Sequence, residues 1–420
     1  MEPHLQRGAL TPGPPSTAGG SGPALPTQLS PSDAAKHLAD GETKIRHLYL
    51  HLPFCKRICP YCDFSTAVGA GADVPGFLKT LGREAELLSE AAVLCQLEPG
   101  GGTLYLGGGT PSWFGTGVLA DLLAWVVSLA GGEWAEATLE MNPEHADPDR
   151  LRVLRSGGIT RLSLGAQSLD PTVLRRLGRV HSPREVCDAA RAARAGGFSV
   201  SVDLMFAVPG QEHAGWRADV DGIVGLEPDH ISLYNLTYEP GTPFTRWLGT
   251  GRLQVLDDDW QAEAYTWAVE RLRAAGYERY EVSNFARPGH ASLHNQAYWN
   301  HDAYLGMGPS AHSLLGRVRT ANLFHLKQWS EAVMEEGRLP WASVERLDEL
   351  ALARERVLLG LRTTRGLAIT ALPARYRQEV VRGAEELVGM DLAVWTEDRA
   401  LVLTDRGVLL ADELAARIAP

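Results

Sequence analysis

The chain has 420 residues, 45% of them hydrophobic and 22% charged, and this balance is typical of a soluble globular protein with two or three domains. The formal net charge of −11 argues against a general nucleic-acid binder and against direct attraction to anionic lipid. No apolar run approaches the roughly 18 residues of a membrane-spanning helix, and the first 32 residues lack the pattern of a secretory signal, so we expect a cytoplasmic protein.

The first forty residues differ in composition from the rest. Residues 1–40 contain seven prolines interleaved with Gly, Ser and Thr, and they contain no aromatic residue. Such a segment cannot bury enough apolar surface to offset the entropy of ordering it. We therefore predict a disordered extension over residues 1–40.

Beyond this extension, short apolar runs alternate with longer amphipathic ones. The pattern predicts strands over 47–52, 103–106, 137–141, 161–165, 199–206 and 230–236. It predicts helices near 74–94, 116–129, 148–156, 183–195, 214–225 and 260–275. Alternating strands and helices indicate a parallel sheet with right-handed crossovers, and six such units fit either an open doubly wound sheet or an incomplete barrel.

The pattern changes after about residue 276. Residues 278–315 are rich in aromatic residues, His, Asn and Gly, which is typical of a binding surface, and we expect a helix-rich tail to follow. That tail includes a helix over 347–361, two short strands over 392–395 and 401–404, and a helix over 405–418. We predict a barrel domain over 41–285 and a C-terminal region over 286–420, with a small winged-helix-like module at about 340–420.

A cluster of cysteines directly after the first predicted strand carries the clearest chemical signal. Cys55, Cys59 and Cys62 lie at the carboxyl end of a parallel strand, where active-site loops gather. Three thiolates at this spacing can bind three irons of a [4Fe–4S] cubane and leave the fourth iron free. The alternatives are zinc with His51 or Asp63 as a fourth ligand, or a redox dithiol that leaves Cys55 unexplained. Cys95 and Cys187 have apolar neighbours and are predicted to be core residues.

This cysteine motif, with an aromatic residue before the last cysteine, resembles that of the radical S-adenosylmethionine (SAM) superfamily. The resemblance implies a [4Fe–4S] cluster on a partial (β/α)6 TIM-like barrel, which decides between the two architectures. Gly107-Gly108-Gly109-Thr110-Pro111 follows the second strand and resembles the family motif that contacts the SAM amino and carboxylate groups. A plain tight turn is the alternative interpretation of these glycines.

Longer stretches resemble the oxygen-independent coproporphyrinogen III oxidase-like group of that superfamily. They are residues 48–55, 106–112, 161–168 and 177–181, and the resemblance extends from about Arg46 to the C-terminus. It implies that Cys55, Cys59 and Cys62 hold the cluster. It further implies a set of residues that contact one or two SAM molecules: Tyr49, Tyr61, Gly108, Gly109, Thr110, Glu140, Gln167, Arg179 and Asp203.

Two features point to the heme chaperones of this group, the HemW family. The oxidase has a further cysteine two residues after the third, whereas Cys62 is followed here by Asp63 and Phe64. Residues 294–299, His-Asn-Gln-Ala-Tyr-Trp, resemble the heme-chaperone motif. An imidazole and aromatic faces suit a heme, so we consider His294, Tyr298 and Trp299 for heme binding. An internally hydrogen-bonded His294 is the alternative, and His290, His301 and His312 are further candidate ligands.

The resemblance implies a chaperone that binds heme, a [4Fe–4S] cluster and SAM and delivers heme to apo-hemoproteins, with no side chain assigned as catalytic. We expect a monomer or dimer whose contact with membranes comes only through partners. The alternative function is anaerobic oxidative decarboxylation of coproporphyrinogen III. The residues for SAM cleavage are present, whereas the Asp63-Phe64 pair argues against the oxidase activity.

Overall fold

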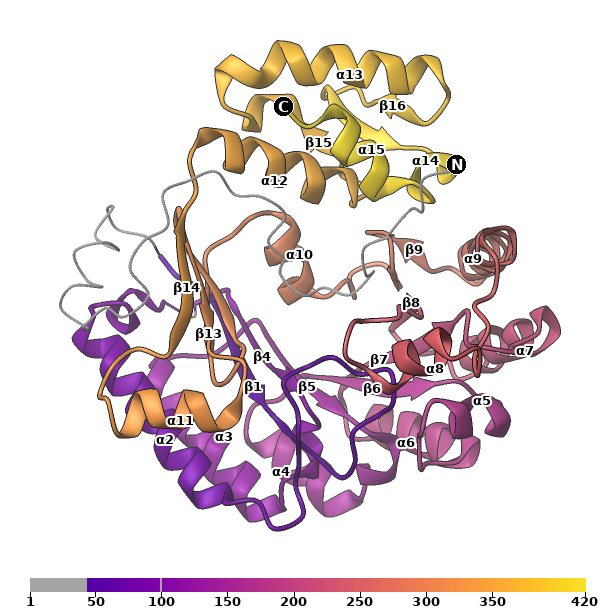
Figure 1. The fold of residues 1–420 in the computed structure, drawn as a ribbon. Helices are drawn as coiled ribbons and strands as arrows, with labels where there is room; N and C mark the ends of the chain where they lie inside the picture. Colours follow the sequence, from indigo (N-terminus) through magenta and orange to yellow (C-terminus); the bar gives the residue numbers. More distant parts are fainter. Residues whose placement is uncertain (1–43, 99) are drawn as a thin grey trace.

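Six parallel strands form the centre of a twelve-stranded sheet (Figure 1). The computed structural model describes residues 44–98 and 100–420, so the predicted extension over 1–40 lies outside the described residues. The six strands, in their order in the sheet, are β1 (His47–Leu52), β4 (Thr103–Gly108), β5 (Glu136–Met141), β6 (Arg161–Gln167), β7 (Ser199–Phe206) and β8 (His230–Asn235). In the described part of the chain β1 pairs with β4 and β11, and not with β8. The parallel strands therefore form the predicted partial barrel.

Helices connect the strands and cover the outside of the sheet (Figure 1). Local sequence signals set their starts; for example, the Ser182 and Glu185 side chains form the capping box that precedes α6. No helix among the described residues is both long and apolar enough to cross a membrane. The helices up to residue 274 are α2 (Val74–Glu90), α3 (Thr116–Ala130), α4 (Pro148–Ser156), α5 (Pro171–Arg176), α6 (Pro183–Ala195), α7 (His213–Val224), α8 (Pro243–Gly249) and α9 (Asp258–Ala274).

The two faces of the barrel strands differ in polarity. Successive side chains of a strand point to opposite faces, and Leu48, Leu50 and Leu52 of β1 are buried in the main hydrophobic core. The alternate positions hold polar residues that contact each other between neighbouring strands, such as Tyr105 with Glu140 and Ser163 with Asp203. The interior of the barrel is therefore a polar site, and the apolar core lies between the sheet and the helices.

The sheet continues beyond the six predicted strands. β11 (Tyr304–Met307) pairs in parallel with β1, and β12 (His312–Leu315), β13 (Val318–Asn322) and β14 (Trp341–Arg346) follow in antiparallel pairs. The expectation of a helix-rich tail after residue 315 was therefore wrong for β13 and β14. β11 was not predicted because glycine is uncommon in strands. Glycine is needed at position 306, since a Cβ there would lie 2.1 Å from the carbonyl oxygen of His312.

Two smaller strands extend the other edge of the sheet, and a C-terminal module follows. β10 (Asn284–Ala286) pairs with β8, and β9 (Glu278–Arg279) pairs with β10, both antiparallel. The module combines a three-stranded antiparallel sheet with four helices, and the predicted helix over 405–418 is divided in two. Its elements are α12 (Glu349–Leu361), β15 (Leu367–Ala368), α13 (Arg377–Gly389), β16 (Ala393–Trp395), β17 (Ala400–Leu403), α14 (Asp405–Val408) and α15 (Ala411–Ile418).

The predicted boundary between residues 285 and 286 lies within the large sheet, because strands from both sides of it belong to that sheet. Figure 1 shows α10 (Leu293–Trp299) between the barrel and the C-terminal module, and α10 contacts both β4 and α12. Elsewhere on the barrel, α11 (Leu326–Met334) packs on α2. The winged-helix interpretation of the module stays a prediction.

A buried carboxylate joins α2 to the strands that the sequence did not predict. Glu84 accepts hydrogen bonds from the backbone N–H of Gly308, from Nδ2 of Asn322 and from Nε1 of Trp329. Burial raises the pKa of Glu84 from 4.5 to about 7, although all three hydrogen bonds act to lower it. Between about pH 4.5 and 7, Glu84 is therefore mostly protonated in the folded chain and mostly ionised in the unfolded chain.

This shift predicts a pH dependence of stability. Between about pH 4.5 and 7 the folded chain holds more protons at Glu84 than the unfolded chain, so the free energy of unfolding should fall as the pH rises through this range. Glu84→Gln cannot titrate, and its free energy of unfolding should change less over the same range. Urea titrations of both proteins at pH 5 and pH 7.5 measure the difference. Equal pH dependence of the two proteins would contradict this role of Glu84.

Candidate functional site

The cysteine loop is anchored at the carboxyl end of β1. Cys55 lies on the short strand β2 (Phe54–Cys55), which pairs with β3 (Ala67–Val68), and the backbone N–H of Cys62 donates to the carbonyl of Cys59 at 3.1 Å. All five cysteines are free thiols. The Thr110 hydroxyl donates to Sγ of Cys55 at 3.3 Å, and Nη1 of Arg179 lies 3.8 Å from Sγ of Cys59. Two donors from other elements thus face sulfurs of the loop.

Burial disfavours the thiolate form of two of the three cysteines of this loop, Cys55 and Cys62. Burial raises the pKa of Cys55, and it raises the pKa of Cys62 to about 12. A bound iron replaces the thiol proton, so cluster binding at this loop would release protons. Among the described residues no group of three or more His, Cys, Asp or Glu side chains is placed to hold one metal ion.

The proposed fourth zinc ligands are not directed at the cysteines. Nδ1 of His51 lies 3.1 Å from the Tyr49 hydroxyl, and Nε2 lies 2.8 Å from the carbonyl oxygen of Ser65. Both ring nitrogens of His51 are therefore engaged, and Asp63 is exposed at the surface. Neither residue supplies a ready ligand for the zinc alternative.

The glycine motif lies beside the cysteine loop at the end of β4. Gly108 has a φ of +103°, and its N–H donates to Oε2 of Glu140 at 3.0 Å. The N–H of Gly109 donates to the carbonyl of Leu52, and a Cβ at Gly109 would lie 2.6 Å from the backbone of Pro53. Close approach of two backbones thus requires these glycines, and it brings Thr110 to Cys55.

Glu140 connects the glycine motif to an aromatic column inside the barrel. Its Oε1 accepts from the Tyr105 hydroxyl at 2.9 Å, and the Tyr105 ring stacks on Tyr49 at 6.0 Å between centroids. Burial raises the pKa of Glu140 to about 7, against the lowering effect of these hydrogen bonds. The structure thus brings Tyr49, Gly108 and Glu140 together, as predicted for residues that share a ligand.

A second group of predicted residues lies at the ends of the next strands. Nη2 of Arg179 donates to Oδ1 of Asn142 at 2.6 Å and to the carbonyl of Gly165 at 2.8 Å. Gln167 has a left-handed backbone with a φ of +66°, and its buried Oε1 has no hydrogen-bond partner among the described residues. Asp203 accepts from the Ser163 hydroxyl at 3.0 Å, and burial raises its pKa. Gln167 thus leaves a buried polar atom for a ligand at this edge.

The remaining predicted residue of this end, Tyr61, packs against α8. Its ring contacts Phe244 at 6.1 Å between centroids, and the N–H of Phe244 donates to the carbonyl of Pro60. Burial raises the pKa of Tyr61, and the nearby Cys59 thiol acts in the same direction. Tyr61 therefore lies between the cysteine loop and α8.

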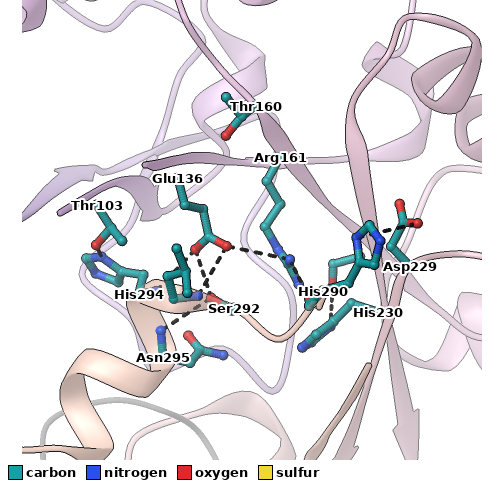
Figure 2. Close-up of polar contacts among 12 residues, drawn as sticks. Thr103, Glu136, Thr160, Arg161, Asp229, His230, His290, Ser292, His294 and Asn295 are labelled. Atoms are coloured by element: carbon teal, nitrogen blue, oxygen red, sulfur yellow. Dashed lines mark hydrogen bonds and ion pairs between the residues drawn. The ribbon is translucent and has the colours of Figure 1, made fainter. Parts of the chain in front are cut away.

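The His294 motif lies at the opposite, amino-terminal end of the barrel strands (Figure 2). His294 is buried, with Nδ1 2.6 Å from the Thr103 hydroxyl and Nε2 2.9 Å from the Tyr298 hydroxyl. Its ring stacks on Tyr105 at 5.0 Å, and burial lowers its pKa to about 3. His294 is thus a neutral imidazole with both nitrogens engaged, and heme binding through Nε2 requires the contact with Tyr298 to break.

The other side chains considered for heme differ in their surroundings. Tyr298 packs edge-on against Tyr304 at 4.6 Å, and the Trp299 ring lies 5.6 Å from the Arg362 guanidinium of the C-terminal module. The alternative histidines are spread over the surface and the interior: exposed His290 pairs with Asp229, His301 pairs with Glu355, and buried Nδ1 of His312 has no partner among the described residues.

A buried ion pair fixes α10 to the barrel (Figure 2). Glu136, at the start of β5, accepts hydrogen bonds from the Ser292 hydroxyl and from the N–H groups of Leu293 and His294. Its carboxylate lies 3.6 Å from Nη1 of Arg161, which also donates to the carbonyl of His290. A carboxylate at the amino end of a helix is stabilising because the first N–H groups have no partner within the helix. Glu136 and Arg161 therefore hold α10 across the amino-terminal end of the barrel.

The arrangement matches known proteins over most of the chain. The radical SAM superfamily model matches residues 49–221. The heme chaperone HemW of Mycobacterium tuberculosis is 41% identical over 370 residues, which cover 87% of this chain and 92% of that protein. The chain belongs to the HemW family of the radical SAM superfamily. HemW of Bacillus subtilis is 32% identical and covers 88% of this chain and 98% of its own.

A solved structure confirms the fold of this HemW-family chain. Coproporphyrinogen III oxidase (HemN) from Escherichia coli, a radical SAM enzyme, superposes with a TM-score of 0.77 and covers 92% of both chains. The sequences are 22% identical, so this likeness supports the fold alone. The predicted partial barrel is thereby confirmed.

Membership of the radical SAM superfamily implies a [4Fe–4S] cluster and SAM. The residues present fit both groups. Three cysteines lie on one loop, and hydrogen-bond donors from Thr110 and Arg179 face two of their sulfurs. Beside them are the backbone of the glycine motif, the Glu140 carboxylate and the orphaned Oε1 of Gln167.

Sequence reasoning missed the residues that organise the amino-terminal end of the barrel. Thr103, Glu136 and Arg161 each begin a strand, and their side chains point inward to α10. A signal for them exists, because each is a polar residue at the first position of a strand whose alternate residues are apolar. The prediction that Cys95 is a core residue was wrong, because Cys95 is exposed and donates only to the carbonyl of Ala92.

The contacts of Glu140 predict its effect on SAM binding. Glu140→Ala removes the acceptor that orients the Gly108 N–H, and it removes a carboxylate predicted to contact SAM. SAM should therefore bind more weakly, and its addition should perturb the electron paramagnetic resonance spectrum of the reduced cluster less than in wild type. A loss of about 1.4 kcal/mol would weaken the affinity for SAM by about tenfold. Glu239→Ala offers a control, because Glu239 lies at the same end of the barrel near Asp63. A full SAM effect in Glu140→Ala would contradict this role.

Proposed function

We propose that this chain is a heme chaperone that binds heme, a [4Fe–4S] cluster and SAM and delivers heme to apo-hemoproteins. One observation carries the proposal: similarity to proteins named heme chaperones extends over 87% of the chain, through the barrel and the region that contains α10. A comparable likeness, at 32% identity over 88% of the chain, supports the same assignment. The predicted barrel over 41–285 and the predicted C-terminal region over 286–420, which contribute strands to one sheet, would then act together.

In this proposal the cysteine loop and the residues around it bind the cluster and SAM. Cys55, Cys59 and Cys62 would hold the cluster, with Thr110 and Arg179 stabilising the thiolates through hydrogen bonds. Tyr49, Tyr61, Gly108, Gly109, Thr110 and Glu140 would bind and orient SAM, and Gln167, Arg179 and Asp203 would hold a second one. The cluster, when bound, supplies an electron that can reduce SAM.

The alternative function is the decarboxylation of coproporphyrinogen III. It has the support of the fold, which this chain shares with the E. coli oxidase. Phe64 stands at the position of the additional cysteine of the oxidase, and its side chain is 50% exposed beside the cysteine loop. A residue linked to that activity is therefore absent, and an apolar surface takes its place.

One sample tests both functions. The chain is reconstituted anaerobically with iron and sulfide, and hemin is titrated into it while the Soret band is recorded. The same sample is then assayed for coproporphyrinogen decarboxylation with SAM and a reductant. Stoichiometric heme binding without turnover supports the chaperone. Turnover on the order of 1 per second or faster would establish the enzyme instead.

A further inference from the structure

Arg179 connects the cysteine loop to two neighbouring strands of the barrel. Its Nη1 lies 3.8 Å from Sγ of Cys59, and its Nη2 donates to Oδ1 of Asn142 at 2.6 Å and to the carbonyl of Gly165 at 2.8 Å. A guanidinium is planar and permanently charged, so its nitrogens keep fixed relative positions. The two acceptors on Nη2 therefore fix the direction of Nη1, which faces the sulfur.

Glycines provide the space that this arrangement needs. Gly178 has a φ of +71°, and a Cβ there would lie 2.8 Å from Cδ of Pro60, so glycine is needed where the chain before Arg179 approaches the cysteine loop. The carbonyl of Gly178 also accepts from Nη1 of Arg57 at 3.4 Å. A Cβ at Gly165 would lie 3.2 Å from Nη2 of Arg179. The segment that carries Arg179 is thus packed against the loop that carries the cysteines.

Asn142 is held in place by its own neighbours. It follows β5 directly, and its N–H donates to the Ser112 hydroxyl at 3.2 Å. Ser112 is buried and also contacts Nδ1 of His145 at 3.0 Å. Because a guanidinium has only donors, the amide oxygen of Asn142 must face Arg179. The end of β5 thus directs Glu140 to the glycine motif and Asn142 to the guanidinium beside Cys59.

A positive charge beside a cluster sulfur changes the energy of reducing the cluster. Reduction adds one electron, taken from an external one-electron donor, and no bond forms or breaks. The added negative charge is stabilised by a nearby cation and by hydrogen bonds to the sulfurs, so both raise the reduction potential. Arg179 brings a cation and a donor to Cys59, whereas Thr110 brings a neutral hydroxyl to Cys55.

We propose that Arg179 raises the reduction potential of the cluster through Cys59, and that Asn142 is the positioning residue that holds the guanidinium there. The inference rests on the proposed function, because it requires the cluster that the three cysteines would hold. It also engages both outer nitrogens of Arg179 on the cluster side, which leaves the buried Oε1 of Gln167 as the free polar atom for the proposed second SAM.

The test is a redox titration of the anaerobically reconstituted full-length chain without SAM, in which the electron paramagnetic resonance signal of the reduced cluster is recorded against potential. Arg179→Met keeps most of the side-chain volume and removes the charge and the donors. The cluster should then be at least about tenfold harder to reduce, which for one electron is a downward shift of about 59 mV. Arg179→Lys keeps the charge and should recover part of this shift.

Two further variants test the role of Asn142. Asn142→Ala should lower the potential by less than Arg179→Met does, because the charge stays but its direction is no longer fixed. In a chain that already carries Arg179→Met, the same change should add no further shift, because Asn142 acts only through Arg179. Arg175→Met is the matched control: Arg175 is an exposed arginine of α5 that bonds the Thr172 hydroxyl, and its loss should leave the potential unchanged.

The outcomes separate this inference from the proposed function. Iron and sulfide analysis of each variant first establishes that the cluster is present. Absence of a cluster in wild type would overturn both the inference and the cluster site. Equal potentials of wild type and Arg179→Met would overturn the inference and leave the cluster site standing. If Arg179→Met does not retain a cluster, Asn142→Ala decides, and an unchanged potential in that variant would contradict the inference.

Discussion

Cys59→Ala should abolish the iron–sulfur cluster. Cys59 is one of three cysteines on the loop after β1, and Arg179 places a donor 3.8 Å from its sulfur. A cubane held by three thiolates loses one of its three protein ligands when Cys59 is replaced, and within the described residues no fourth cysteine stands near the loop. Iron and sulfide analysis with Mössbauer spectroscopy after anaerobic reconstitution should show loss of the [4Fe–4S] signal.

The chain contains a control for this experiment. Cys95 is an exposed free thiol on a different part of the barrel, so Cys95→Ala should retain the cluster at the wild-type stoichiometry. Retention of a full cluster by Cys59→Ala would contradict the assignment of the loop. Stoichiometric zinc without iron or sulfide in wild type purified anaerobically would contradict it as well.

Glu136→Ala should cause the largest loss of stability among single substitutions at the amino-terminal end of the barrel. Glu136 accepts three hydrogen bonds from the start of α10 and pairs with Arg161, whose side chain is 4% exposed. Removal of one partner of a buried ion pair leaves the other charge uncompensated and typically costs about 3–5 kcal/mol. We expect a decrease of that order in the free energy of unfolding measured by urea titration.

Two further variants define the origin of this loss. Glu133→Ala alters an exposed carboxylate three residues away and should change the free energy of unfolding by less than about 0.5 kcal/mol. Glu136→Ala combined with Arg161→Ala should cost less than the sum of the two single changes, because the double variant leaves no unpaired charge. A Glu136→Ala protein as stable as Glu133→Ala would show that α10 is held by other contacts.

The barrel was predictable from the sequence because its signals are local. Period-two alternation located β1 and β7 to the residue, and the capping box at Ser182 located the start of α6. β11 to β14 were not predicted, because glycines and polar residues interrupt their apolar pattern. In addition, the pairing of β11 with β1 spans about 250 residues of sequence. Pairing between strands so far apart in the sequence depends on tertiary packing, which a local sequence pattern does not predict.

The site was predictable to different degrees at its two ends. Cys55, Gly108 and Glu140 each follow or end a parallel strand, and the carboxyl ends of such strands meet at one edge, so their proximity follows from chain order. The sequence motif drew attention to His294 but assigned it neither to a helix nor to one end of the barrel. Its position depends on Glu136 and Arg161, which lie more than 130 residues earlier in the chain.

The most direct test of the chaperone account is heme transfer. The reconstituted chain, loaded with one equivalent of hemin and freed of excess, is mixed with an apo-hemoprotein, and the Soret spectrum of the acceptor is followed over time. The account predicts that the acceptor gains its holo spectrum as the heme on this chain disappears, with no decarboxylation of coproporphyrinogen III by the same sample. Heme that stays on this chain, together with decarboxylation turnover, would contradict it.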